Sequence, residues 1–170
     1  MEESVYVTGF SGRFPPGCSS VADFWEYLTH GRDFPAGDVD MTIMQQQRSE
    51  VFLGHHLEPN SPPLSLLQVI YEAISDASYC QDDLKDTNTG VYTSLNMPDA
   101  KNTDENPSSA EQISALFGLP GPAVMVNAGC HTGSTGGLVA LDLAVHAIRS
   151  GVVSRALVVD GDWTTSAREY

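Results

Sequence analysis

The stretch that decides the fold is residues 124–151, "VMVNAGCHTGSTGGLVALDLAVHAIRSG". An apolar run ends in a turn of small residues that carries a cysteine and a histidine, and a glycine-rich segment then leads into an amphipathic helix. This order is typical of a strand that passes into a helix through a tight elbow. The helix is expected over residues 136–151, with Gly151 as its C-terminal cap. Its expected apolar stripe consists of Leu138, Leu141, Val145 and Ile148.

Strand and helix patterns alternate along the rest of the chain. Strands are expected at residues 4–9, 89–95, 121–129 and 155–163. Helices are expected at residues 21–31, 62–79 and 109–118, and residues 32–63 and 96–109 have the composition of loops. The alternation predicts an α/β fold with a mostly parallel sheet flanked by helices. A length of 170 residues without an interior linker predicts a single domain over residues 1–170.

The charge of the chain limits its partners. The formal net charge is −14, with only 8 lysines and arginines. Nucleic acid and anionic membrane surfaces would be repelled. No apolar run approaches the ~20 residues of a membrane span, and the acidic start does not resemble a signal peptide, so a cytoplasmic location is expected. Three widely spaced cysteines predict free thiols rather than a disulfide framework.

Cys130, His131 and Ser134 are the candidate reactive residues of the elbow. A thiolate of Cys130 would be stabilised by backbone N–H groups and by the helix dipole, and the same amides suit a developing oxyanion. The alternative for Cys130 is an inert buried thiol. His131 has the chemistry of a general base, or of a loop histidine bonded to backbone. Ser134 stands at the helix entrance as a rival nucleophile or as an ordinary N-cap.

Asp160 and Asp162 follow the apolar run "ALVV" and are expected at the carboxyl end of a strand. Ligands bind at that edge of open α/β sheets, where a partly desolvated carboxylate can act as a base. The alternative is that both are turn residues. The segment "HHLEP" at 55–59 lacks a second ligand cluster, and "GSTGG" lacks the spacing of a phosphate loop. No metal and no cofactor are therefore expected.

Several collinear motifs resemble the N-terminal half of the β-ketoacyl synthase (ketosynthase) domain of polyketide synthases. "VYVTGFSGRFPPGCSSVADFWEYLTHGRD" is similar to the opening of that family, and "LSLLQVIYEAISDAS" to its next helix. "TGVYTS" resembles its following strand, and "QISALFGLPGPAVMVNAGC" the approach to its catalytic cysteine. "GLVALDLAVHAIRSGVVSRALV" resembles the helix and strand after that cysteine. The resemblance implies half of a thiolase-like fold.

The chain departs from the family pattern around the nucleophile. The family's cysteine is followed by S-S-S-L-V-A-L, whereas Cys130 is followed by "HTGSTGGLVAL", which is four residues longer. Alignment from the left places Cys130 at the catalytic position, and alignment from the right places Ser134 there. The uninterrupted match of "GPAVMVNAGC" favours Cys130, and both placements stay open. The family's two catalytic histidines belong to its C-terminal half, so no histidine of this chain matches them.

The resemblance implies a stand-alone, truncated ketosynthase-like protein of polyketide biosynthesis that does not extend chains. The expected activity is that of a cyclase-type enzyme: aldol or Claisen-type cyclisation, dehydration or isomerisation of a released polyketide. The alternative is a non-catalytic remnant that binds or scaffolds a synthase. Half of a thiolase-like fold would expose apolar surface, which predicts a homodimer or higher oligomer. An acidic carrier protein is a disfavoured partner, and a small polyketide-like molecule is the expected substrate.

Overall fold

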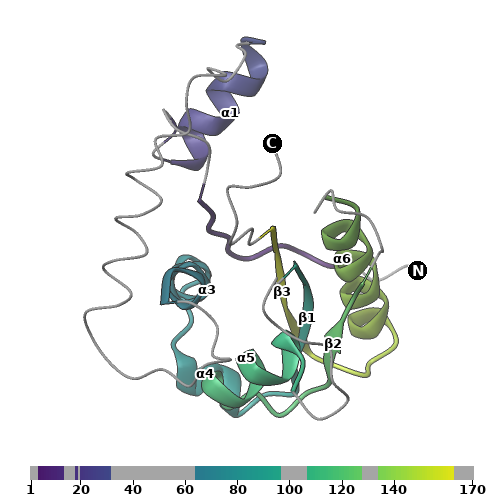
Figure 1. The fold of residues 1–170 in the computed structure, drawn as a ribbon. Helices are drawn as coiled ribbons and strands as arrows, with labels where there is room; N and C mark the ends of the chain where they lie inside the picture. Colours follow the sequence, from purple (N-terminus) through teal and green to yellow (C-terminus); the bar gives the residue numbers. More distant parts are fainter. Residues whose placement is uncertain are drawn as a thin grey trace. The chain divides into compact units, whose positions relative to one another are not determined.

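The computed structural model describes residues 4–13, 18, 20–31, 64–96, 107–127 and 134–162. The chain divides into two compact units. The first consists of Met1–Val7, Asn60–Pro62 and Tyr79–Tyr170, and it contains the sheet with helices α4, α5 and α6. The second consists of Thr8–Pro59 and Pro63–Ser78, and it contains helices α1 and α3. Figure 1 labels these elements.

The sheet of the first unit is parallel, as the alternating pattern predicts. Its strands are β1 (Thr89–Asn96), β2 (Ala123–Met125) and β3 (Arg155–Asp162), in the order β2-β1-β3. Val91 of the central strand lies opposite Ala123 on one side and Leu157 on the other. Because the strands are parallel, their carboxyl ends meet at one edge of the sheet.

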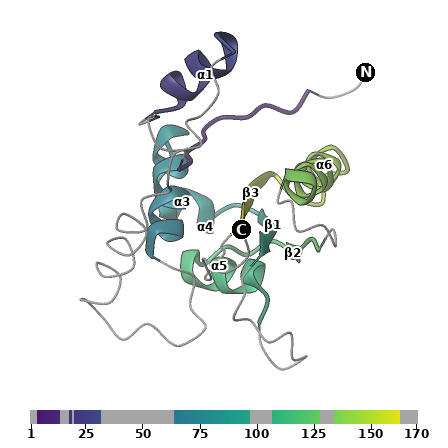
Figure 2. The same ribbon diagram turned by 45° about the horizontal axis from the view of Figure 1, so that its top comes forward.

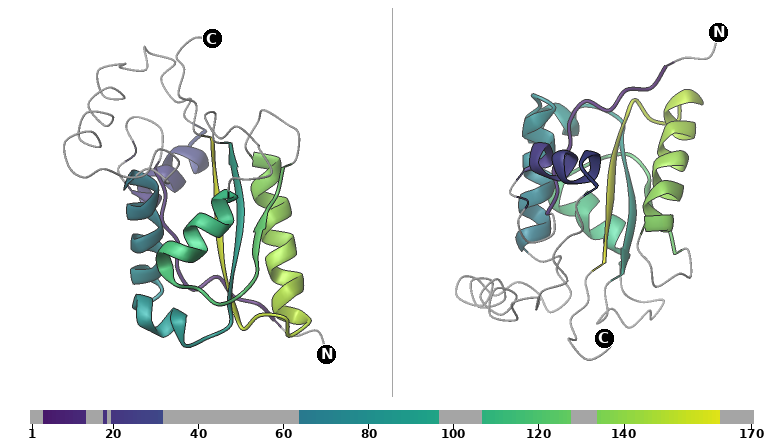
Figure 3. Two further views of the ribbon diagram at one scale, coloured as in Figure 1. Left: turned by 60° about the horizontal axis from the view of Figure 1, so that its bottom comes forward. Right: turned by 90° about the horizontal axis from the view of Figure 1, so that it is seen from above.

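Helices cover both faces of this sheet, as Figure 3 shows. Helix α5 (Ser109–Phe117) packs on β1 and β2, and helix α6 (Ser134–Arg149) packs on β1 and β3 on the opposite face. Side chains of β1 alternate between the two: the buried Thr93 hydroxyl bonds that of Ser109 at 2.9 Å, whereas Tyr92 packs against α6. Burial on both faces explains why β3 contains the unbroken apolar run "ALVV" rather than an alternating pattern.

The apolar stripe predicted for α6 is wrong in two of its four members. Leu138 is 68% exposed and Leu141 is 41% exposed, while Val145 and Ile148 are half-buried. The residues that α6 turns toward the sheet are small, with Ala140 and Ala144 buried against Tyr92 and Ala147 partly buried beside them. Small side chains allow the helix axis to approach the strands closely, so size rather than hydrophobicity selects the buried face.

The strand predicted at residues 4–9 is also wrong. Residues 4–10 form neither helix nor strand, and Tyr6 and Val7 are 79% and 76% exposed. A strand exists only when a neighbour pairs with its backbone groups, and in the described part of the sheet β1, β2 and β3 pair with one another alone. The local apolar pattern therefore predicted a strand at residues 4–9 that pairs with none of the three described strands.

The first unit also contains α4 (Gln81–Lys85), a short helix that the sequence analysis did not predict. It lies beside α5 (Figure 2). The Gln81 amide donates to the carbonyl of Phe117 at 3.1 Å, at the end of α5. Helix α5 itself begins with a capping box formed by Ser108 and Glu111 and ends at Gly118 in the left-handed conformation, with φ of 66°. The predicted start of α5 is thus confirmed, and its last predicted residue, Gly118, is the C-cap.

The second unit contains α1 (Val21–Thr29) and α3 (Leu64–Asp76), both predicted as helices. Ser20 caps the start of α1 by accepting from the Asp23 N–H, and Gly31 follows its end with φ of 58°. On α3 the buried apolar side chains are those of Leu66, Ile70 and Ile74, whereas Tyr71 is 62% exposed.

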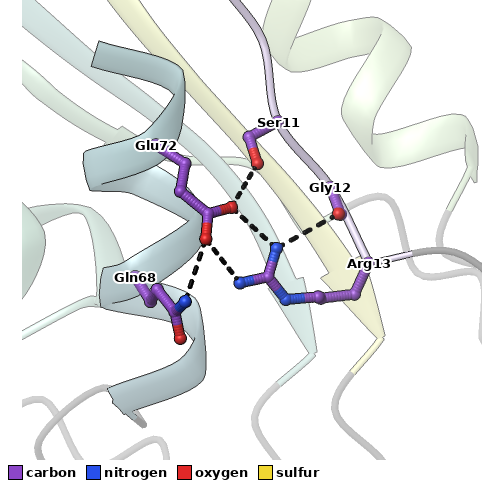
Figure 4. Close-up of polar contacts among 5 residues, drawn as sticks. All are labelled: Ser11, Gly12, Arg13, Gln68 and Glu72. Atoms are coloured by element: carbon purple, nitrogen blue, oxygen red, sulfur yellow. Dashed lines mark hydrogen bonds and ion pairs between the residues drawn. The ribbon is translucent and has the colours of Figure 1, made fainter. Parts of the chain in front are cut away.

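Glu72 of α3 fixes the segment that follows Gly9 (Figure 4). Its carboxylate accepts from both terminal nitrogens of Arg13 at 2.7 and 2.9 Å and from the Ser11 hydroxyl at 2.7 Å. The Gln68 amide supplies a fourth bond at 2.9 Å. These donors, Arg13 first, lower the pKa of Glu72 to about 2.

We expect Glu72→Gln to loosen residues 10–13 because the bidentate ion pair is lost. The depressed pKa means that the pair stabilises fully above the ordinary value of 4.5 and that this contribution is lost as pH falls toward about 2. Since both side chains are partly exposed, the loss of stability at pH 7 should be about 1 kcal/mol or less. Hydrogen exchange of the amides of residues 10–13 at pH 7 measures the local effect, with Glu26→Gln on α1 as the control. Equal exchange in the two variants would contradict the assignment.

Candidate functional site

The candidate site lies at the carboxyl edge of the parallel sheet. Strands β1 and β3 end there with Asn96 and Asp162, and these two residues are paired in register. Helix α6, which runs antiparallel to the strands that it covers, begins near the same edge with Ser134 (Figure 3). Strand ends and a helix N-terminus thus meet in one place, which is where open α/β sheets bind ligands.

The structure places three of the five predicted site residues. Asp160 and Asp162 are within the last three residues of β3, at the predicted edge. Ser134 is the first residue of α6, two positions before the predicted start of the helix, so it lies in the first turn rather than ahead of it. Cys130 and His131 lie outside the described residues.

Asp160 is packed against the first turns of α6. A Cβ atom added at Gly137 would overlap the Cγ and Oδ2 atoms of Asp160. The carboxylate therefore occupies the space that a side chain at position 137 would need. Gly137 and Asp160 belong to different elements, so this contact joins α6 to the end of β3.

The Asp160 carboxylate has two hydrogen-bond donors. They are the Ser94 hydroxyl, from the residue that is paired with Asp160 in register on β1, and the N–H of Gly161. The pKa of Asp160 is nevertheless raised above its ordinary value, because desolvation against α6 outweighs both donors. Asp160 is nevertheless an exposed residue, so it is accessible to solvent or a ligand.

This arrangement suits proton transfer. A carboxylate whose basicity is increased by desolvation is a better general base than an ordinary aspartate. The first N–H groups of α6 have no partner within the helix, and they favour negative charge that develops nearby. A base and an anion-stabilising helix terminus therefore lie at the same edge of the sheet.

Sequence reasoning missed Ser94 and the role of Gly137. Ser94 was part of a predicted strand, but nothing in the sequence states which strand lies next to it. Ser94 could have been found from its position near the end of a predicted strand, because a hydroxyl there can contact a carboxylate at the end of the neighbouring parallel strand. Gly137 was read as part of the helix start, whereas its missing side chain is what admits Asp160.

Three other features of the described residues bear on function. His146 is exposed on α6, and its Nδ1 lies 3.4 Å from an Asp142 carboxylate oxygen. Among the residues that the structure describes, no group of three or more histidines, cysteines, aspartates and glutamates is placed to hold a metal ion. None of the described helices is long and apolar enough to cross a membrane.

Comparison with known families identifies the chain. The family model described as "Beta-ketoacyl synthase, N-terminal domain" matches residues 63–169, which include the sheet, α6 and the candidate site. The chain belongs to this family. The resemblance seen in the sequence motifs and the predicted α/β fold class are thereby both confirmed.

Relatives of this ketosynthase-like chain are parts of large synthases. It is 28% identical to polyketide synthase GfsB of Streptomyces halstedii, over 92% of this chain and 4% of that protein. It is 26% identical to the highly reducing polyketide synthase cm3B of Cordyceps militaris, over 92% of this chain and 8% of that protein. The chain thus matches a ketosynthase-like segment of proteins many times its length.

Solved structures show the same fold. The oxazolomycin ketosynthase domain OzmH KS8 of Streptomyces albus matches with a TM-score of 0.58 and 30% identity, over 89% of this chain and 38% of that chain. A ketosynthase from module 1 of the bacillaene synthase of Bacillus amyloliquefaciens matches with a TM-score of 0.65 at 22% identity, over 95% of this chain and 34% of that one. The chain therefore spans less than half the length of these ketosynthases.

We expect Asp160→Asn to stabilise the ketosynthase-like chain at neutral pH. A raised pKa in the folded state means that folding favours the protonated carboxyl, so stability declines as pH rises from the ordinary aspartate value through the raised one. Asparagine removes this decline, and because Asp160 is partly exposed the gain should be at most about 1 kcal/mol at pH 7.

Urea unfolding between pH 3 and pH 8 measures the difference between Asp160→Asn and the wild type. Asp142→Asn, on the exposed side of α6, is the matched control and should change stability by less than about 0.5 kcal/mol. A difference for Asp160→Asn that grows on acidification would show that the sign is wrong.

Proposed function

We propose that this chain is an enzyme of polyketide or related natural-product biosynthesis that performs cyclase-type chemistry on a released intermediate and does not extend chains. Family membership supports the pathway, since its relatives include polyketide synthases. The observation that carries the proposed chemistry is the partly desolvated Asp160 carboxylate, which packs against α6 at the carboxyl edge of the sheet. A base in this position suits removal of a proton next to a carbonyl group.

In the proposed reaction the Asp160 carboxylate takes a proton from the carbon between two carbonyl groups of the substrate. The resulting enolate carbon attacks a different carbonyl group, farther along the same molecule, and forms the ring bond. The protonated Asp160 then returns its proton to the new alkoxide. The N-terminal amides of α6 stabilise the negative oxygen, and Cys130, His131, Ser134 and Asp162 are the further residues that we assign to the site.

A linear 3,5,7-trioxo ester is a suitable probe for this proposal, because attack of its C2 on the C7 carbonyl closes a six-membered ring. Deuterium uptake at its α-carbons and ring formation are both followed by mass spectrometry. Asp160→Asn should reduce the enzymic rate by about 10²-fold or more, the usual range for loss of a general base, while Asp142→Asn should leave it unchanged. If the wild type gives no rate above buffer, the alternative of a non-catalytic protein that binds a synthase replaces the enzyme proposal.

The three cysteines provide a test of which residue is the nucleophile. Desolvation, with the nearby charge of Asp23, raises the pKa of Cys18, and Cys80 is an exposed thiol at the start of α4. If Cys130 occupies the nucleophile position, it should be alkylated by iodoacetamide faster than both and at lower pH. Peptide mass spectrometry between pH 5 and pH 9 measures all three rates together. A slow Cys130 would transfer the role to Ser134.

We further propose that the chain self-associates. Several apolar side chains of the sheet unit are exposed, and in α6 these are Leu138, Val139, Leu141 and Leu143. Association of copies would remove such surface from water. Light scattering should therefore give a mass of at least two chains, and a monomer that binds no apolar dye would count against this.

The charge of −14 supports a released small molecule as the substrate. Carrier proteins are typically acidic, so like charges would oppose their docking. Tight binding of an acyl carrier protein at physiological salt would contradict this part of the proposal.

A further inference from the structure

We propose that Ser94 and Gly137 are positioning residues that hold the Asp160 carboxylate in a fixed place at the carboxyl edge of the sheet. The proposal rests on the proposed function only for the catalytic role of Asp160. The positioning itself is a property of the folded chain, and it can be measured without any substrate.

The register of the strands places Ser94 beside Asp160. Ser94 on β1 is paired with Asp160 on β3, and the pair two residues earlier is Tyr92 with Val158. Tyr92 and Val158 pack against α6, so the alternation of side chains places Ser94 and Asp160 on the same face, next along toward the edge. The Ser94 hydroxyl donates to the carboxylate, which restricts its rotation from the β1 side.

Gly137 limits the space of the Asp160 carboxylate from the side of α6. Because any Cβ at position 137 would overlap the carboxyl group, the helix backbone itself forms one wall of the space that Asp160 occupies. A glycine inside a helix is less favourable than alanine by about 1 kcal/mol. The contact with Asp160 gives a physical reason for a glycine at this position.

The charged and titratable groups around Asp160 are few in the described residues. On β1 the titratable residue of the same face is Tyr92, which is buried two positions away. On α6, residues 134–141 contain no ionisable side chain other than hydroxyls, and the first is the exposed Asp142. On β3 Asp162 follows two residues later. The Ser94 hydroxyl and the Gly161 N–H are thus the groups that favour the ionised form of Asp160.

The test is the titration of Asp160 in the full chain, followed through the ¹³C shift of its side-chain carboxyl and assigned by comparison with Asp160→Asn. Ser94→Ala removes a donor to the charged form, so the titration midpoint should move to higher pH than in the wild type. Ser94→Thr keeps the hydroxyl and should restore the midpoint. Gly137→Ala should act in the opposite direction, because a carboxylate displaced into solvent loses its desolvation.

Ser154→Ala is the matched control. The Ser154 hydroxyl donates to the Asn88 carbonyl at 3.3 Å, just before β3 and at the other end of the strand pair. It should leave the Asp160 midpoint unchanged. An unchanged midpoint in Ser94→Ala, or equal shifts in Ser94→Ala and Ser94→Thr, would overturn the proposal.

Activity on the trioxo ester separates this proposal from the proposed function. Opposite shifts in Ser94→Ala and Gly137→Ala support the positioning role even where the wild type shows no activity. If the wild type is active and Ser94→Ala shifts its pH–rate profile in the same direction as its midpoint, both proposals are supported. An active wild type whose Asp160 midpoint does not respond to Ser94→Ala would keep the enzyme and remove the positioning role.

Discussion

The close approach of α6 to the sheet is the constraint on which the rest of this unit depends. It is made possible by a row of small residues, Gly137, Ala140, Ala144 and Ala147, at the spacing of one helix face. The buried Tyr92 ring fills the space beside these alanines. Because the helix lies so near, its backbone is within contact distance of the last residues of β3. The same approach that buries Tyr92 therefore brings Asp160 against Gly137.

The same constraint explains why leucines of α6 face outward. A helix has a limited arc that can contact one sheet, and here that arc is taken by alanine and glycine. The periodicity of the sequence correctly predicted a helix from the recurrence of apolar residues. It could not predict which side faces the strands, because the leucine and alanine rows have almost the same spacing. Only the distance between helix and sheet distinguishes them, and that distance is a property of the packed structure.

The candidate site could also be predicted only in part: the sequence indicated where its residues lie along the strands but not which residues contact them. Position at a strand end follows from local sequence, so the placement of Asp160 and Asp162 was foreseen. The partners of Asp160 follow from strand order and register, which depend on pairings between residues 66 positions apart in the chain, such as Ser94 and Asp160. The failed strand at residues 4–9 has the same cause. Its apolar pattern is local, whereas a strand requires a neighbour that local pattern cannot supply.

The contact between Asp160 and Gly137 supports the proposal that this edge of the sheet binds a ligand. Each residue lowers the stability of the folded chain. Partial desolvation of a carboxylate costs more free energy than that of a neutral side chain of similar size, and a glycine weakens the helix that contains it. An asparagine at 160 would keep the bond from Ser94, and a smaller residue there would remove the overlap that excludes alanine at 137. A purely structural contact would therefore need neither residue. Two destabilising choices that meet at one contact, on the ligand-binding edge of an α/β sheet, are the arrangement expected where function and stability compete.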